Sequence, residues 1–181
     1  MICFLDRDGI INIDYGYVGS IDRFVWNPGI FSLLGLLKSK GYTFVLITNQ
    51  SGIGRGYYSF SDFFDLSFYI INYLYFHFDI NLEVNFCPHT PLDNCKCRKP
   101  SPAMLLRYSI GDFDIMIGDN PSDMESAFSA GVPHRWLISS QPSGQFTAAF
   151  PSICDLCDSD YLASFFLIFS FFLPSFALGT F

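Results

Sequence analysis

Residues 3–9 read CFLDRDG, and this stretch decides the fold of the chain. An apolar run of strand-forming residues leads directly into two carboxylates, Asp6 and Asp8, and Gly9 then allows a sharp turn. In an open parallel α/β sheet, ligands bind just beyond the carboxyl ends of the strands. The stretch therefore predicts a buried strand whose end presents a carboxylate pair, suited either to holding a cation or to attacking an electrophile. A strand followed by an ordinary polar turn is the alternative.

Apolar segments of two lengths alternate along the chain after this point. Short continuous apolar runs are typical of parallel strands covered on both faces, and longer segments with helical spacing predict helices. Strands are expected at residues 43–47, 83–86 and 114–117, and helices at 30–37, 61–78, 103–109 and 124–130. Asn27 and Pro28 offer the N-cap and first position of the first helix. This alternation calls for an α/β fold with a doubly wound parallel sheet.

The composition fits a globular domain and limits its partners. Of the 181 residues, 50% are hydrophobic and 15% are charged, which excludes a disordered chain and favours one domain with a sizeable core. The net charge of −7 argues against nucleic-acid binding, which needs a basic surface. A local group of cations can still bind a small phosphorylated ligand. Because no basic segment followed by an apolar core stands at the N-terminus, a cytoplasmic protein is expected.

Two further polar stretches follow expected strands. Residues 48–56 (TNQSGIGRG) combine hydroxyl and amide side chains with three glycines and Arg55, a composition that brings backbone N–H groups close to an anion. Residues 117–123 (IGDNPSD) place more carboxylates at a strand end. Each stretch alone is compatible with an ordinary turn, but the repetition of phosphate and cation chemistry after successive strands favours one shared site.

A loop rich in cysteine and histidine follows the strand expected at 83–86. Its pattern, C-x-H-x5-C-x-C, supplies three thiolates and an imidazole for the four tetrahedral positions of zinc: Cys87, His89, Cys95 and Cys97. With no position left for water, such a zinc ion would be structural, and its binding would order a loop too small to hold itself by hydrophobic burial. Coincidental thiols or a redox pair are the alternatives.

Arg98 and Lys99 come directly after the last expected zinc ligand. A fixed Cys97 would therefore fix where these two cations point. Arginine offers a phosphate group a bidentate fork, and lysine offers it a point charge. The pair thus favours a phosphate ligand, with two solvated surface charges as the alternative.

Taken together, these motifs resemble those of the haloacid dehalogenase-like superfamily of phosphohydrolases. Its first to fourth motifs are matched by LDRDG (5–9), ITNQSG (47–52), RKP (98–100) and IGDNPSD (117–123). Within the superfamily, INIDYGYV (11–18), TNQSGIGRG and the zinc loop resemble the heptose bisphosphate phosphatases. The resemblance covers residues 2–138. It implies a Rossmann-like, haloacid dehalogenase-like fold with a small zinc-binding loop and no large cap domain.

The resemblance implies a role for each matching position. Asp6 would be the nucleophile that forms an aspartyl-phosphate, and Asp8 the acid that protonates the leaving oxygen and later the base that activates water. Thr48 and Lys99 would stabilise the transferring phosphoryl group. Mg²⁺ would be held by Asp6, the backbone carbonyl of Asp8 and Asp119, with Asp123 near its water molecules. Contacts with the substrate would come from Asp14, Tyr15, Gly16, Tyr17, Asn49, Gln50, Ser51, Arg55, Arg98 and Asn120.

The closer resemblance also implies the substrate, a small phosphorylated sugar. Heptose 1,7-bisphosphate would lose its C7 phosphate, on the route to nucleotide-activated heptose and the lipopolysaccharide core. Histidinol-phosphate phosphatases are the alternative, because the zinc loop is short and Asn120 stands where a basic residue is more usual. A zinc-stabilised binding module without catalysis would predict substitutions in the motif carboxylates and Lys99, and all are present. Enzymes of this kind often work as monomers, and a monomer is expected.

The chain beyond residue 138 lies outside the resemblance. Residues 141–145 (QPSGQ) have the composition of a linker. Cys154 and Cys157 are expected to be incidental thiols, because no second pair lies nearby. The prediction is a phosphatase domain over residues 1–150, including the zinc loop at 87–97, followed by an apolar tail over residues 151–181.

Residues 161–181 carry no charge and are just long enough to span a bilayer. Pro174 and Gly179 interrupt the run, however, and no basic flank follows. These features favour a segment packed on the domain over membrane association.

Overall fold

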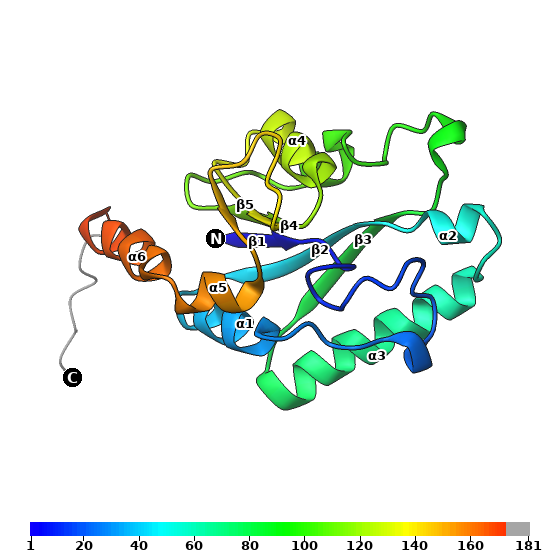
Figure 1. Ribbon diagram of the computed structural model, residues 1–181, viewed down its shortest axis with the longest axis horizontal. Helices are drawn as coiled ribbons and strands as arrows, with labels where there is room; N and C mark the ends of the chain where they lie inside the picture. Colours follow the sequence, from blue (N-terminus) through cyan, green and yellow to red (C-terminus); the bar gives the residue numbers. More distant parts are fainter. Residues whose placement is uncertain (173–181) are drawn as a thin grey trace.

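Six parallel strands form one sheet, and β1 (Ile2–Leu5) lies in its interior (Figure 1). The structure is a computed structural model that describes residues 1–172. The sheet order is β3-β2-β1-β4-β5-β6, and each neighbouring pair is parallel. The other strands are β2 (Thr43–Asn49), β3 (Leu82–Cys87), β4 (Ile115–Gly118), β5 (His134–Ile138) and β6 (Ala148–Phe150). The strand order reverses between β1 and β4, and open α/β sheets bind ligands at such a point.

Helices cover both faces of the sheet (Figure 1). One face packs against α1 (Ile30–Ser39), α3 (Phe60–Phe78), α5 (Ile153–Asp158) and α6 (Asp160–Phe172). The other packs against α4 (Pro121–Ala130) and a 3₁₀ helix at Pro102–Arg107. Shorter elements are α2 (Ser51–Gly54) and 3₁₀ turns at Ile21–Arg23 and Pro91–Asp93.

Strand β1 is buried on both faces because its apolar side chains alternate between the two helical layers. Cys3 and Leu5 pack in the cluster with α1 and α3, whereas Phe4 packs in the cluster with α4, and all three side chains are fully buried. The predicted doubly wound α/β fold is confirmed, and residues 1–172 contain no large cap domain.

Two details of the predicted helices are wrong. Helix α1 does not begin at Pro28: its N-cap is Gly29, with φ of 82°. Asn27 instead donates its side-chain amide to the Gly9 carbonyl (2.6 Å) and so braces the turn after β1. The segment predicted as a helix at 103–109 forms a tighter 3₁₀ helix at Pro102–Arg107. Helix α1 has no side-chain capping hydrogen bond at Gly29, whereas Ser101 caps the 3₁₀ helix by accepting from the Ala103 N–H (3.4 Å).

The chain beyond residue 138 continues the same sheet. The QPSGQ segment is a loop between two strands and not a linker, because β6 pairs with β5 directly after it. In α6, Leu162, Phe165 and Phe166 are buried against the core, with the Phe165 ring edge-to-face on Trp136 at 5.1 Å between centroids.

The described part of the apolar tail is therefore packed on the domain. Pro174 and Gly179 lie outside the described residues. Over residues 1–172, no helix combines the length and the hydropathy that crossing a membrane requires.

Candidate active site

A pocket of about 520 Å³ opens at the carboxyl ends of the central strands. Most residues that the sequence predicts for catalysis, substrate binding and Mg²⁺ binding line it, namely Asp6, Asp8, Asp14, Gly16, Tyr17, Thr48, Asn49, Gln50, Ser51, Arg98, Lys99, Asp119, Asn120 and Asp123. Tyr15 and Arg55 are not among the lining residues, whereas Tyr58, Pro100 and Ser122 are additional ones. Loops far apart in the sequence thus meet at one cavity where the strand order reverses.

The turn after β1 delivers Asp6 and Asp8 to this pocket. Asp6 still belongs to the sheet, because its backbone N–H donates to the Ile117 carbonyl of β4 (3.0 Å). Gly9 then turns the chain with φ of 86°. A Cβ atom at Gly9 would lie 2.1 Å from a carboxylate oxygen of Asp119. Glycine is therefore required here both for the backbone conformation and for the close approach of Asp119.

Three carboxylates and one ammonium group form the floor of the pocket. Asp6, Asp119 and Asp123 each place a carboxylate oxygen within 4.8 Å of the others. Lys99 lies beneath them with 2% of its surface exposed. Its Nζ is 3.0 Å from Asp6 Oδ1 and 2.6 Å from Asp123 Oδ1, and it also donates to the Ile47 carbonyl (2.6 Å). One cation therefore faces three carboxylates.

The pKa values of these groups reflect that imbalance. Burial, reinforced by the negative charges of Asp6 and Asp123, raises the pKa of Asp119 to about 8. Burial also raises the pKa of Asp6 to about 6, although Lys99 opposes the shift. Burial alone would lower the pKa of Lys99, but its ion pairs with Asp123 and Asp6 raise it, so Lys99 is a cation. A cluster of oxygen donors with an excess of negative charge fits a hard divalent cation such as Mg²⁺.

Asn49 holds the backbone of Lys99. Its side-chain amide donates to the Lys99 carbonyl (3.1 Å), and its Oδ1 accepts from the Lys99 N–H (3.0 Å). The sequence predicts Asn49 as a substrate contact, and its side chain does line the pocket. The structure adds a positioning contact that the sequence pattern does not indicate.

The Asp8 carboxylate lies in a cage of donors. Arg7 is fully buried, and its Nη2 lies 2.9 and 2.8 Å from the two oxygens of Asp8 and 2.5 Å from the Val18 carbonyl. Asn12 and Gln50 each donate a side-chain amide to Asp8 at 3.0 Å. No role was predicted for Arg7 from the sequence. Its position between two carboxylates is the one signal in the sequence that could have indicated this contact.

Asn120 and Asp123 also begin helix α4. Asn120 is the N-cap, and its Oδ1 accepts from the Ser122 N–H (3.0 Å). Asp123 Oδ2 accepts from the Asn120 N–H (3.1 Å), which completes a capping box. The oxygen that faces Lys99 is the other one, Oδ1, so a single carboxylate serves both the helix and the site.

The loop over the pocket is held by Arg23, a residue outside every motif quoted above. Its guanidinium donates to the carbonyls of Tyr15 (3.1 Å), Gly16 (2.9 Å) and Tyr17 (3.2 Å). Arg55 approaches this loop rather than the pocket, with Cζ 5.8 Å from the centre of the Tyr17 ring. Tyr15 is 56% exposed.

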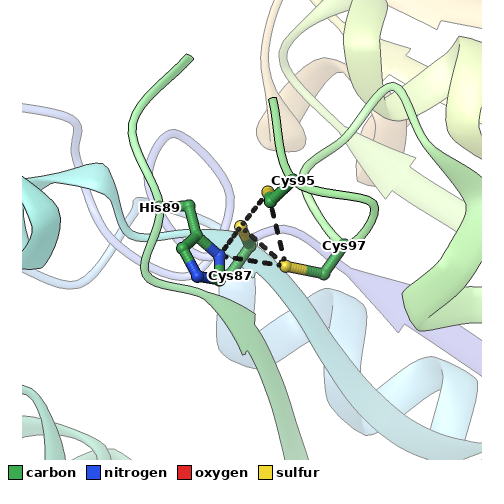
Figure 2. A group of neighbouring side chains, drawn as sticks. All are labelled: Cys87, His89, Cys95 and Cys97. Carbon is green, nitrogen blue, oxygen red and sulfur yellow. Dashed lines mark hydrogen bonds between the residues drawn. The ribbon is translucent and has the colours of Figure 1, made fainter. Parts of the chain in front are cut away.

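The four residues of the predicted zinc loop converge on one point (Figure 2). Cys97 Sγ lies 3.1 Å from Cys87 Sγ and 3.5 Å from Cys95 Sγ. His89 presents Nδ1 to the cluster, 3.3 Å from Cys97 Sγ and 3.5 Å from Cys87 Sγ. A tetrahedron with zinc–sulfur bonds of about 2.3 Å has edges of about 3.8 Å. The sulfur–sulfur separations of 3.1 to 3.5 Å are shorter than this edge, and the convergence of three thiols and an imidazole is the feature that fits zinc.

Comparisons with known proteins identify relatives of this chain. No family model matches the chain. The chain is 46% identical over 145 residues to D-glycero-beta-D-manno-heptose-1,7-bisphosphate 7-phosphatase of Helicobacter pylori, covering 77% of this chain and 84% of that protein. It is 40% identical over 161 residues to D-glycero-alpha-D-manno-heptose-1,7-bisphosphate 7-phosphatase of Campylobacter jejuni, covering 84% and 91%.

A solved structure agrees in fold. It is D,D-heptose 1,7-bisphosphate phosphatase of B. bronchiseptica, complexed with magnesium and phosphate. Its TM-score is 0.76 at 28% identity, covering 90% of this chain and 98% of that one. With these relatives and a pocket built from the expected motifs, the chain is a phosphatase that belongs to the heptose 1,7-bisphosphate 7-phosphatase family of the haloacid dehalogenase-like superfamily.

Proposed function

We infer that this phosphatase removes the C7 phosphate of D-glycero-D-manno-heptose 1,7-bisphosphate, as a step towards nucleotide-activated heptose. The observation that carries the proposal is the pocket itself. It sets Asp6 against Lys99 at 3.0 Å, beside Asp119 and Asp123, in a chain whose relatives are named for this substrate.

The first half of the proposed reaction transfers the phosphoryl group to the protein. A carboxylate oxygen of Asp6 bonds to phosphorus while the bond from phosphorus to the C7 oxygen breaks. Asp8 gives a proton to that oxygen, which leaves as the sugar hydroxyl. Lys99 and the Thr48 hydroxyl offset the charge on the equatorial phosphoryl oxygens.

The second half releases phosphate and restores the side chains. Asp8, now ionised, takes a proton from a water molecule whose oxygen attacks phosphorus, and the bond to Asp6 breaks. Splitting the hydrolysis in this way lets one carboxylate serve as acid and then as base. Mg²⁺, held by Asp6, Asp119 and the backbone carbonyl of Asp8 with Asp123 nearby, would supply positive charge against the repulsion between nucleophile and phosphate.

A two-substrate assay tests the proposed function. The purified protein with Mg²⁺ is expected to release phosphate from heptose 1,7-bisphosphate with a kcat/KM at least about tenfold higher than from histidinol phosphate. Both anomers are assayed, because the two relatives are named for different ones. A higher kcat/KM for histidinol phosphate would replace the proposed substrate.

We also propose that zinc occupies the cluster of Cys87, His89, Cys95 and Cys97. Support comes from the donor set and from its place in the chain, two residues before Lys99. An ion there would fix the loop that carries Arg98 and Lys99 to the pocket. Zinc needs thiolate ligands, so a reducing compartment such as the cytoplasm suits this site. A monomer suffices, since one chain lines the whole pocket.

Zinc removal is expected to loosen this loop and to lower phosphatase activity about tenfold or more, even when Mg²⁺ is returned in excess. Metal analysis, phosphate release and limited proteolysis on one sample follow the change. Cys97→Ser is expected to lose zinc, whereas Cys154→Ser, at an exposed cysteine in α5, keeps it. Full activity of a zinc-free sample would contradict the link between the loop and Lys99.

A further inference from the structure

We propose that Tyr58 is a positioning residue that, through Gln50, sets the direction of the hydrogen bonds to both Asp8 and Thr48. This inference rests on the acid–base role proposed above for Asp8. Tyr58 lies between α2 and α3 and lines the pocket, but neither the motifs nor the proposed mechanism gives it a task.

A chain of three short hydrogen bonds joins these residues. The Tyr58 hydroxyl donates to Gln50 Oε1 at 2.6 Å. Gln50 is 1% exposed, and its Nε2 donates to Asp8 Oδ2 (3.0 Å) and to Thr48 Oγ1 (2.8 Å). All three partners of the Gln50 amide therefore belong to the pocket.

The direction of this chain follows from the chemistry of its ends. A side-chain amide has one accepting and one donating end, and its two orientations differ only in which end faces which partner. Burial raises the pKa of Tyr58, so its hydroxyl keeps its proton at neutral pH. The Gln50 Nε2 end faces the Asp8 carboxylate, which can only accept a hydrogen bond when it is ionised. Gln50 Oε1 therefore faces the Tyr58 hydroxyl and accepts its proton.

This orientation matters for Asp8 because the carboxylate must carry a proton in one half of the reaction and lose it in the other. Every side-chain partner of Asp8 described above is a donor. The Asn12 amide is held with its Nδ2 end towards Asp8, because Nδ2 also donates to the Ile13 carbonyl (2.8 Å). If the Gln50 amide were reversed, its Oε1 would repel ionised Asp8 or hold the proton of neutral Asp8 away from the leaving oxygen.

The same orientation leaves the Thr48 hydroxyl free to donate. Since Thr48 Oγ1 accepts from Gln50 Nε2, its own proton can point to a phosphoryl oxygen in the pocket. A reversed Gln50 would accept that proton and remove the donor. One hydroxyl, on Tyr58, therefore controls two groups that act on the substrate.

The fold holds the Tyr58 ring in a slot between two glycines. A Cβ atom at Gly19 would lie 2.3 Å from the ring, and one at Gly52 would lie 2.2 Å from it. Gly52 belongs to the TNQSGIGRG loop, whose composition predicts glycines that bring N–H groups close to an anion. The structure shows a second reason why glycine is needed at position 52: a side chain there would collide with the Tyr58 ring.

Tyr58→Phe tests the proposal, because it removes the hydroxyl and keeps the ring. A sugar phosphate that the wild-type protein hydrolyses is compared with 4-nitrophenyl phosphate, whose leaving group needs little protonation. We expect kcat/KM to fall about thirtyfold for the sugar phosphate and about threefold for the aryl phosphate, so that their ratio falls about tenfold. The ratio is independent of how much of the sample is folded.

Tyr42→Phe is the matched control. Tyr42 is buried, and its hydroxyl donates to the Phe113 carbonyl (2.9 Å) outside the residues that line the pocket, so its loss should leave the ratio unchanged. Tyr58→Phe is also expected to have no further effect in a Gln50→Ala background. An unchanged ratio in Tyr58→Phe, or an independent effect in that background, would overturn the proposal. Failure to hydrolyse heptose bisphosphate would refute only the proposed substrate, since the ratio can be measured with any sugar phosphate.

Discussion

Asp6→Asn is expected to reduce phosphate release by at least about 10⁴-fold while leaving the fold intact. The amide has nearly the shape of the carboxylate but cannot form an acyl phosphate. It also removes a negative charge at Asp6 that burial and the nearby charges of Asp123 and Asp8 disfavour, although Lys99 favours it. We therefore expect no loss in thermal stability. Residual activity within tenfold of wild type would exclude Asp6 as the nucleophile.

The measurement pairs steady-state phosphate release with thermal unfolding of the same preparation. Asp65→Asn is the matched control, because Asp65 is an exposed carboxylate on α3 outside the residues that line the pocket. Rapid quenching of the wild-type protein should trap a phosphoryl group on the chain, and the same treatment of Asp6→Asn should trap none.

Lys99→Met is expected to damage activity and stability together. It removes the buried cation that faces Asp6 at 3.0 Å and Asp123 at 2.6 Å. Leaving buried carboxylates without their partner costs about 3 kcal/mol of unfolding free energy. The loss of a cation beside the phosphoryl group should lower kcat about 10³-fold. Urea unfolding and phosphate release measure the two effects.

A second substitution separates the two effects of Lys99. In Lys99→Met/Asp123→Asn, one buried charge is removed along with its partner, so part of the stability should return while activity stays low. Lys96→Met, at an exposed lysine three residues earlier, should change neither. Recovery of activity in the double variant would show that Lys99 acts only by holding the structure together.

The sequence predicted those parts of the site whose residues can be recognised from their spacing along the chain. The zinc ligands lie within eleven residues, so their pattern alone specifies a tetrahedral donor set. Asp6, Asp8, Thr48 and Asp119 each follow an apolar strand, and parallel strands bring their carboxyl ends together. The family resemblance then distinguished a nucleophile from a metal ligand, which spacing alone does not do.

The parts that the sequence missed depend on partners distant in the chain. Arg7 is buried because its guanidinium donates to Asp8 and to the Val18 carbonyl. The pattern of apolar residues around Arg7 does not indicate that its side chain points inward. Gln50 was predicted as a substrate contact, yet its bonds run to Asp8 and Tyr58. Strands β5 and β6 were not predicted. In β5, His134 and Arg135 interrupt the apolar run, and β6 is only three residues long.

The paired hydrogen bonds between Asn49 and Lys99 join segments that are 50 residues apart in the chain. Closing a loop of this length costs conformational entropy. The position of Lys99 therefore depends on a contact between distant parts of the chain and not only on local helices and strands. Recovery of turnover after refolding is for this reason a stricter measure of the native state than recovery of secondary structure.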